Sequence, residues 1–189
     1  MAQSIRISTT PPKNYVPSGR NADPAVTEKV LSDVIEFLTS EKCAGRGTGS
    51  DGANTAAMFI SQKFSDCGLV PVNGSWSHAF PVNAERVKGT GRNIMGVYVG
   101  ANAPKNTRYV IVGAHYDNLG VLEGKMYPGA DSNASGVAAM FSIIDMLQVM
   151  KDLGRTYSKN ILFVAFDGKE ANSSGAEYLL KQIEKGELM

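Results

Sequence analysis

Residues able to do chemistry gather where the apolar run FVAF ends, in the stretch FVAFDGKEANSSGAEYL. The run stops at Asp167, and a glycine, Lys169 and Glu170 follow directly. Polar groups at the carboxyl ends of strands in α/β proteins often belong to binding or catalytic sites, because ligands bind outside those ends. The alternative is a solvated loop that merely terminates a strand, and this stretch alone does not separate the two.

Two further polar clusters have a similar setting. GAHYDN follows the apolar run RYVIV and contains His115 and Asp117, and GADSNASG opens an apolar helical stretch and contains Asp131. Strand ends that meet at one edge of a sheet would bring both clusters to Glu170. A histidine with carboxylates is the usual ligand set of a hydrolytic zinc site, so His115, Asp131 and Glu170 are candidate metal ligands. Asp117 could orient the His115 imidazole.

Each of these residues also has a simpler interpretation. Asp131 precedes Ser132 and Asn133, and an aspartate in that setting more commonly caps a helix. A lone histidine beside a strand end, such as His115, is more often structural than metal-binding. The joint placement of the three clusters, rather than any single residue, favours a metal site.

The elements that must position these clusters follow from the apolar periodicity. Residues 109–113 and 161–166 are nearly continuous apolar runs, as expected of central strands buried on both faces, and the strongly apolar helix 136–153 lies between them. Two earlier segments, 74–87 and 91–101, predict an antiparallel pair of strands. Strands alternating with helices in the later half indicate an α/β fold, a three-layer sandwich with a mixed β-sheet.

The first third of the chain is predicted to be helical after an arm. Residues 1–24 are rich in Pro, Ser, Thr and Asn and predict an extended arm, followed by one domain at 25–189. Apolar spacing predicts a helix over 25–45, and a second helix follows the glycine-rich link GRGTGSDG and ends at Gly68.

Bulk composition excludes several classes of protein. The 189 residues carry a formal net charge of +1, which gives no electrostatic footprint for nucleic acid or an anionic membrane. No run approaches the length of a transmembrane helix, and the N-terminus MAQSIRISTT has no apolar signal core. Cys43 and Cys67 are too few for a disulfide framework, so free thiols and a single pair both stay open.

The three clusters together resemble a known family. GAHYDN, PGADSNASGVAAM and FVAFDGKE with GAEYL behind it look like the motifs of the zinc-dependent aminopeptidases, the metallopeptidase family of bacterial secreted leucine aminopeptidases, related to glutaminyl cyclases and glutamate carboxypeptidase II. The stretch AGRGTGSDGANTAAMFISQKFSDCGLVPV resembles the family's lead-in, and GRNIMG its next strand. The resemblance covers about residues 31–180, and three motifs in the correct order make it specific.

The resemblance implies a site with two zinc ions. Asp131 would bridge the metals, His115 would bind one and Glu170 the other, with Asp117 behind His115. It also implies a peptide substrate and a secreted or periplasmic location, although this chain shows no signal peptide.

The sequence departs from the family pattern in two respects. The family has Gly-Glu-Glu where this chain has Gly-Lys-Glu, so Lys169 occupies the general-base position, and an ammonium is a poor base at neutral pH. Asp167 is a candidate substitute, two residues earlier. The family also takes a carboxylate and a histidine from beyond the second glutamate, and no Asp or His follows Glu170 here. The remaining histidine, His78, matches no family ligand and is interpreted as structural.

Three functional hypotheses follow. The chain resembles the N-terminal two-thirds of a zinc exopeptidase, apparently truncated at the C-terminus or divergent, with weak or absent zinc binding and little activity alone. Alternatively, it is a non-catalytic relative that binds peptides or a partner. The third hypothesis is a fragment completed by another chain or by self-association.

Overall fold

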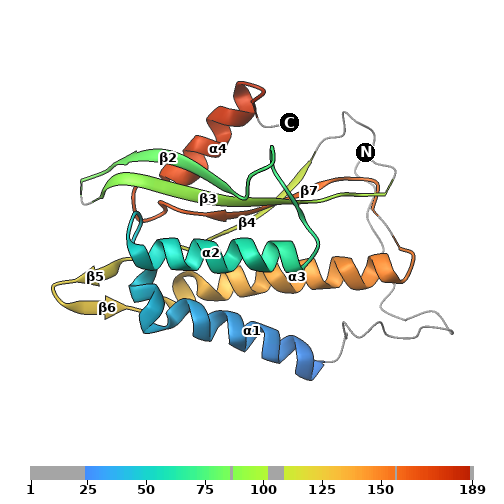
Figure 1. Cartoon of the computed structure of the whole chain (residues 1–189), viewed down its shortest axis with the longest axis horizontal. Helices are drawn as coiled ribbons and strands as arrows, with labels where there is room; N and C mark the ends of the chain where they lie inside the picture. Colours follow the sequence, from blue (N-terminus) through green and yellow to red (C-terminus); the bar gives the residue numbers. More distant parts are fainter. Residues whose placement is uncertain (1–23, 86, 102–108, 156, 188–189) are drawn as a thin grey trace.

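The computed structural model describes residues 24–85, 87–101, 109–155 and 157–187. Two helices come first, six strands follow, and a third helix, a seventh strand and a fourth helix complete the described chain (Figure 1). The helical segments are α1 (Pro24–Thr39), a 3₁₀ turn η1 (Glu41–Arg46), α2 (Asp51–Asp66), an irregular turn η2 (Ala130–Ala134), α3 (Ser135–Asp152) and α4 (Ser174–Glu184). The strands are β1 (Val70–Pro71), β2 (Ser77–Asn83), β3 (Lys88–Tyr98), β4 (Val110–His115), β5 (Gly120–Leu122), β6 (Lys125–Tyr127) and β7 (Ile161–Phe166).

The main sheet is mixed, as the sequence predicts. Its strand order is β1-β3-β7-β4, with β2 also paired to β3. Strand β3 is antiparallel to β1, β2 and β7, whereas β4 runs parallel to β7. Helices α2 and α3 lie on one face of the sheet, with α1 outside them, and α4 lies on the other face (Figure 1). The predicted three-layer α/β sandwich and the antiparallel β2–β3 pair are confirmed.

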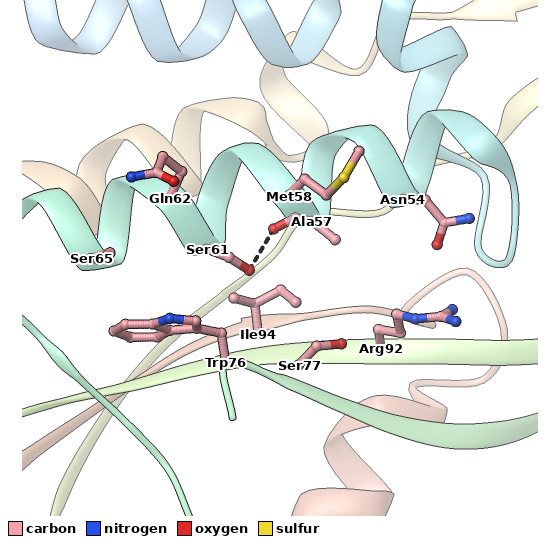
Figure 2. A pocket seen from close by; sticks show the side chains of 10 residues that line it. All are labelled: Asn54, Ala57, Met58, Ser61, Gln62, Ser65, Trp76, Ser77, Arg92 and Ile94. Carbon is pink, nitrogen blue, oxygen red and sulfur yellow. Dashed lines mark hydrogen bonds between the residues drawn. The ribbon is translucent and has the colours of Figure 1, made fainter. Parts of the chain in front are cut away.

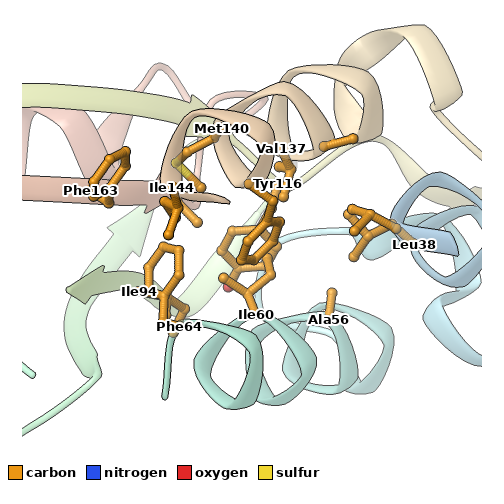
Figure 3. Close-up of a cluster of buried hydrophobic side chains, with 14 of the residues drawn as sticks. Leu38, Ala56, Ile60, Phe64, Ile94, Tyr116, Val137, Met140, Ile144 and Phe163 are labelled. Atoms are coloured by element: carbon orange, nitrogen blue, oxygen red, sulfur yellow. The ribbon is translucent and has the colours of Figure 1, made fainter. Parts of the chain in front are cut away.

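The main hydrophobic core fills the space between the sheet and the helices α1, α2 and α3 (Figure 3). The labelled members include Leu38 of α1, Phe64 of α2, Ile144 of α3 and Phe163 of β7. All four side chains are fully buried. Burying each such side chain contributes about 1.5–3 kcal/mol relative to exposure, so this core holds the strand ends in fixed positions.

Strand β7 is central and buried on both faces, with residues 162–165 fully inaccessible to solvent. The prediction that residues 109–113 form an equally central strand is wrong. Strand β4 pairs with β7 alone among the described strands, and Val110 and Ile111 are 50% and 44% exposed. A continuous apolar run predicts burial on both faces of a sheet. Strand β4, however, is the last strand of the described sheet, and no described strand covers its outer edge.

Three other expectations are corrected. The first helix ends at Thr39, and the 3₁₀ turn η1 then completes the segment predicted as one helix to residue 45. The segment between GAHYDN and GADSNASG, to which the sequence assigns no strand, contains the short hairpin β5–β6. The stretch Ala130–Asp152 is long and apolar enough, by length and composition, to cross a membrane, although no such run was expected; its apolar residues pack into the main core. The predicted arm lies outside the described residues except Pro24, where α1 begins.

Candidate active site

Two parallel strands bring the polar clusters to one end of the sheet. In the register of β4 and β7, His115 lies opposite Phe166, so GAHYDN and FDGKE leave the sheet at the same level. Gly168 follows with a φ of 73°, a conformation that suits glycine and turns the chain sharply before Lys169 and Glu170. The convergence expected from the sequence therefore holds for these two clusters.

Asp117 lies directly against the ring of His115. The Nδ1 atom of His115 is 3.1 Å from the backbone oxygen of Asp117 and 3.6 Å from its Oδ1 atom. A ring nitrogen facing two acceptors favours the tautomer with the proton on Nδ1. The Nε2 atom is then the ring nitrogen left to act as an acceptor or a metal ligand.

The Asp117 carboxylate is fully buried and joins two segments of the site. Its Oδ2 atom accepts hydrogen bonds from the Thr48 hydroxyl at 3.2 Å and from the Glu170 backbone N–H at 3.0 Å. Its Oδ1 atom has no hydrogen-bond partner within the described part of the chain and faces the His115 ring. A buried carboxylate oxygen is costly to leave unpaired. The Asp117 Oδ1 atom therefore favours a proton donor, and the His115 ring is the group that it faces.

Lys169 and Glu170 are paired with each other. The Lys169 Nζ atom lies 2.7 Å from Glu170 Oε1, and the lysine side chain is 48% exposed. This hydrogen bond to Glu170 raises the pKa of Lys169 above its usual value. Lys169 is therefore protonated at neutral pH and unsuited to accept a proton, and the Glu170 carboxylate is partly neutralised by it.

Asp167, the candidate substitute base, has structural bonds. Its Oδ2 atom accepts from the Arg92 backbone N–H at 2.9 Å, and Oδ1 accepts from the Gly168 N–H at 2.8 Å. Burial raises the pKa of Asp167. The residue is 2% exposed, so its carboxyl serves to hold the strand end against β3.

Asp131 does not cap α3. The N-cap residue of α3 is Ala134, and the Gly136 backbone N–H in the first turn donates to the Oδ1 atom of Asn133 at 3.1 Å. Asp131 is exposed, and its carboxylate has no hydrogen-bond partner in the described segments. The helix-cap interpretation is thus wrong, and the side chain is free to bind a ligand.

Four of the candidate residues line two separate cavities, whereas Asp117 and Asp131 line neither. His115, Asn133, Asp167 and Lys169 line a cavity of about 270 Å³ at the carboxyl ends of β4 and β7. Glu170 instead lines a second cavity, of about 420 Å³, together with Thr48 and Asn118 among others. Lys169 and its partner Glu170 stand at the boundary between the two.

Sequence reasoning missed Arg46, which holds the site loops together. Its guanidinium is fully buried and donates to four backbone carbonyls: Tyr116 at 2.6 Å, Pro128 at 2.8 Å, Gly129 at 2.9 Å and Leu38. Burial lowers the pKa of Arg46. The one signal for it in the sequence is a basic residue among the glycines of the link GRGTGSDG.

The described residues do not form a complete metal site. No three His, Cys, Asp or Glu side chains within them are grouped to hold a metal ion. His115 has a free Nε2 atom and Asp131 a free carboxylate, which suit zinc, but the Glu170 carboxylate is bound to an ammonium. His115, Asp131 and Glu170 as ligands therefore stay a prediction.

Comparison with known proteins shows the family of the chain. The sequence model of peptidase family M28 matches residues 93–188, which is half of the chain. The uncharacterized protein YfbL of Escherichia coli (strain K12) is 30% identical over 144 residues, covering 71% of this chain and 38% of that protein. The chain thus spans well under half the length of this relative.

Solved structures share the fold. The LapA aminopeptidase of Legionella pneumophila superimposes with a TM-score of 0.60 and 17% identity, over 94% of this chain and 46% of that chain. A glutaminyl cyclase of Porphyromonas gingivalis gives a TM-score of 0.59 and 19% identity, over 75% of this chain and 47% of that chain. At these identities the likeness shows the fold, and each covered share is less than half of the solved chain.

Proposed function

This chain belongs to peptidase family M28, and from that premise we propose that it carries part of a zinc-dependent exopeptidase site of the aminopeptidase type. The observation that carries the proposal is the contact between His115 and the buried Asp117 at the carboxyl end of two parallel strands. A histidine held by a carboxylate, with its other nitrogen free, is how a protein presents an imidazole to a metal.

Each residue has a role in this proposal. Asp117 positions His115 and also fixes the backbone of Glu170, so one buried carboxylate sets two of the three candidate ligands. Asp131, in the turn η2 directly before α3, supplies the third candidate ligand. A peptide is the ligand, bound with its scissile bond near the cavity of about 270 Å³.

The 189-residue chain alone binds zinc weakly and hydrolyses peptides poorly in this proposal. Working zinc sites use three or more protein ligands per metal, and the described residues group no such set. Lys169 adds a positive charge beside Glu170 and cannot take a proton from water at neutral pH. Further ligands would come from more of a longer protein or from another chain, and a secreted or periplasmic setting goes with the family resemblance.

Zinc titration with leucine-anilide hydrolysis tests the proposal. The wild-type chain should bind zinc weakly, and His115→Ala should abolish the binding that remains, whereas the control His78→Ala, at a half-buried position on β2, should not alter it. Turnover should be close to background for all three proteins. Robust zinc-dependent turnover by the unmodified chain would contradict the proposal of weak activity, and equal zinc binding by the His115→Ala variant would contradict the site.

A further inference from the structure

A groove runs between α2 and the β2–β3 hairpin, away from the candidate active site (Figure 2). Its volume is about 590 Å³. Helix α2 contributes one wall and the strands the other; the lining residues are Asn54, Ala57, Met58, Ser61, Gln62, Ser65, Trp76, Ser77, Arg92 and Ile94. We call it the α2–β3 groove.

The groove has an apolar floor. Ile94 is fully buried there, and the Trp76 ring packs on Phe64 with 6.3 Å between ring centroids. Met58 on α2 is 66% exposed and lines the same groove. A flat apolar group would contact the half-buried Trp76 on one side and Met58 on the other, with Ile94 buried beneath it.

Arg92 places an unpaired cation in the groove. Within the described residues no carboxylate lies in ion-pair distance of its guanidinium, and no acidic residue lines the groove. Its backbone is fixed at both polar atoms: the N–H donates to Asp167 at 2.9 Å, and the oxygen accepts from the Tyr116 hydroxyl at 3.0 Å. A guanidinium on a rigid strand matches a carboxylate in a bidentate manner.

Arg92 is the one charged residue that lines the groove, and two of the five other polar side chains there are already engaged. The Ser61 hydroxyl donates to the Ala57 oxygen at 2.8 Å (Figure 2), and the Gln62 amide donates to Asp66 at 2.8 Å. Arg92 is therefore the group that can orient a ligand. A side chain at Gly96 would lie 3.0 Å from the Trp76 ring, so Trp76 covers β3 four residues beyond Arg92, about 13 Å along the strand.

We propose that the α2–β3 groove binds a small monocarboxylate with a flat apolar body. The carboxylate pairs with Arg92, and the body lies over Ile94 and against Trp76, beside Met58. This site shares no lining residue with the two cavities of the candidate active site and needs no metal. It therefore stands or fails separately from peptide hydrolysis.

Trp76 provides the measurement, because it is the one tryptophan in the sequence. The full 189-residue chain is titrated with 4-phenylbutyrate while tryptophan emission is followed, and with the uncharged 4-phenylbutanamide as a matched probe. The acid should give a saturable change in emission in the millimolar range, and the amide a response about tenfold weaker or less, because it lacks the charge that pairs with a guanidinium.

Variants localise the binding. Arg92→Gln should weaken the binding of the acid by about tenfold or more, while Arg92→Lys should retain part of the affinity. Lys88→Gln makes the same charge change at an exposed position on the same strand and should retain the full affinity. Circular dichroism checks that each variant is folded. An absent or non-saturable response to the acid, equal responses to acid and amide, or an unchanged affinity in folded Arg92→Gln would overturn the proposal.

Discussion

The ammonium of Lys169 lies 2.7 Å from the carboxylate of Glu170, its immediate neighbour along the chain. Glu170 is a candidate zinc ligand, and Lys169 is at the position of the family's general base, so one ion pair involves both. Since the hydrogen bond to Glu170 raises the pKa of Lys169, the lysine is charged at neutral pH. The two departures in function expected of this chain, weak zinc binding and a missing base, have this one contact in common.

Replacing Lys169 by glutamate should improve zinc affinity without restoring full turnover. The change removes a positive charge beside Glu170, frees that carboxylate and adds an acceptor. Isothermal titration with zinc checks the affinity, with Lys42→Glu as a control of equal charge change at an exposed position. An affinity that rises equally in both variants would mean that net charge, and not the Lys169–Glu170 pair, governs zinc binding.

Replacing Asp117 by asparagine should destabilise the fold. The buried carboxylate accepts hydrogen bonds from Thr48 and from the Glu170 backbone, and hydrogen bonds to charged groups contribute about 1.5–3 kcal/mol. We expect a loss of about 1–3 kcal/mol in the free energy of unfolding, measured with urea. Thr48→Val removes one of these bonds and should cost about 1 kcal/mol. A wild-type midpoint for Asp117→Asn would refute the bridging role.

Replacing Arg46 by methionine should destabilise the protein by about 2–4 kcal/mol, because four buried carbonyls lose their donor. Arg46→Lys keeps the charge but cannot reach all four acceptors, so its loss should be intermediate. Urea unfolding measures both variants. If the Arg46→Met variant were as stable as the wild type, the hydrogen bonds from Arg46 to these four carbonyls would not contribute to stability.

Strand β7 could be predicted to the residue, whereas the contacts of the site could not. The apolar run that ends at Asp167 predicts a buried strand, and Ile161–Phe166 is found as expected, whereas the similar run of β4 is half exposed. Lys169 and Glu170 follow a turn at Gly168 with a φ of 73°. A glycine allows this angle but does not require it, so the sequence does not predict the direction of the two side chains. Arg46 was unpredictable for a related reason: three of its four acceptors are 70 to 83 residues away in sequence.

The short hairpin β5–β6 escaped prediction because each strand has three residues, too few to show alternation. The alternative interpretation of Asp131, a helix cap, rests on residue type alone. In the structure α3 starts after Ala134, because η2 departs from helical geometry at Ser132 and Asn133.

Stability should depend on pH through Asp167. Burial raises the pKa of this carboxyl above the unfolded value, which is about 3.9. Between these two pKa values the native state binds a proton that the unfolded state has released, so the contribution to stability falls as the pH rises. The free energy of unfolding of wild type minus that of Asp167→Asn should therefore decrease from pH 4 upward. A difference that grows with pH would contradict the buried, proton-retaining carboxyl.

The outer edge of β4 should make the protein self-associate. This strand has no partner on that side among the described strands, and Val110 and Ile111 are 50% and 44% exposed. Unpaired edges with apolar side chains promote association with another chain. We expect sedimentation velocity to show a dimer, or larger species, whose fraction grows with protein concentration.

The edge variant Ile111→Lys should shift that equilibrium to monomer, because pairing would bury the new charge. Val121→Lys, on the separate β5–β6 hairpin and 52% exposed in the wild type, should leave it unchanged. Monomer at every concentration in the wild type would show that β4 needs no partner. Association that survives Ile111→Lys but is lost in Val121→Lys would show that the β5–β6 hairpin forms the interface. The β4 edge would then take no part in association.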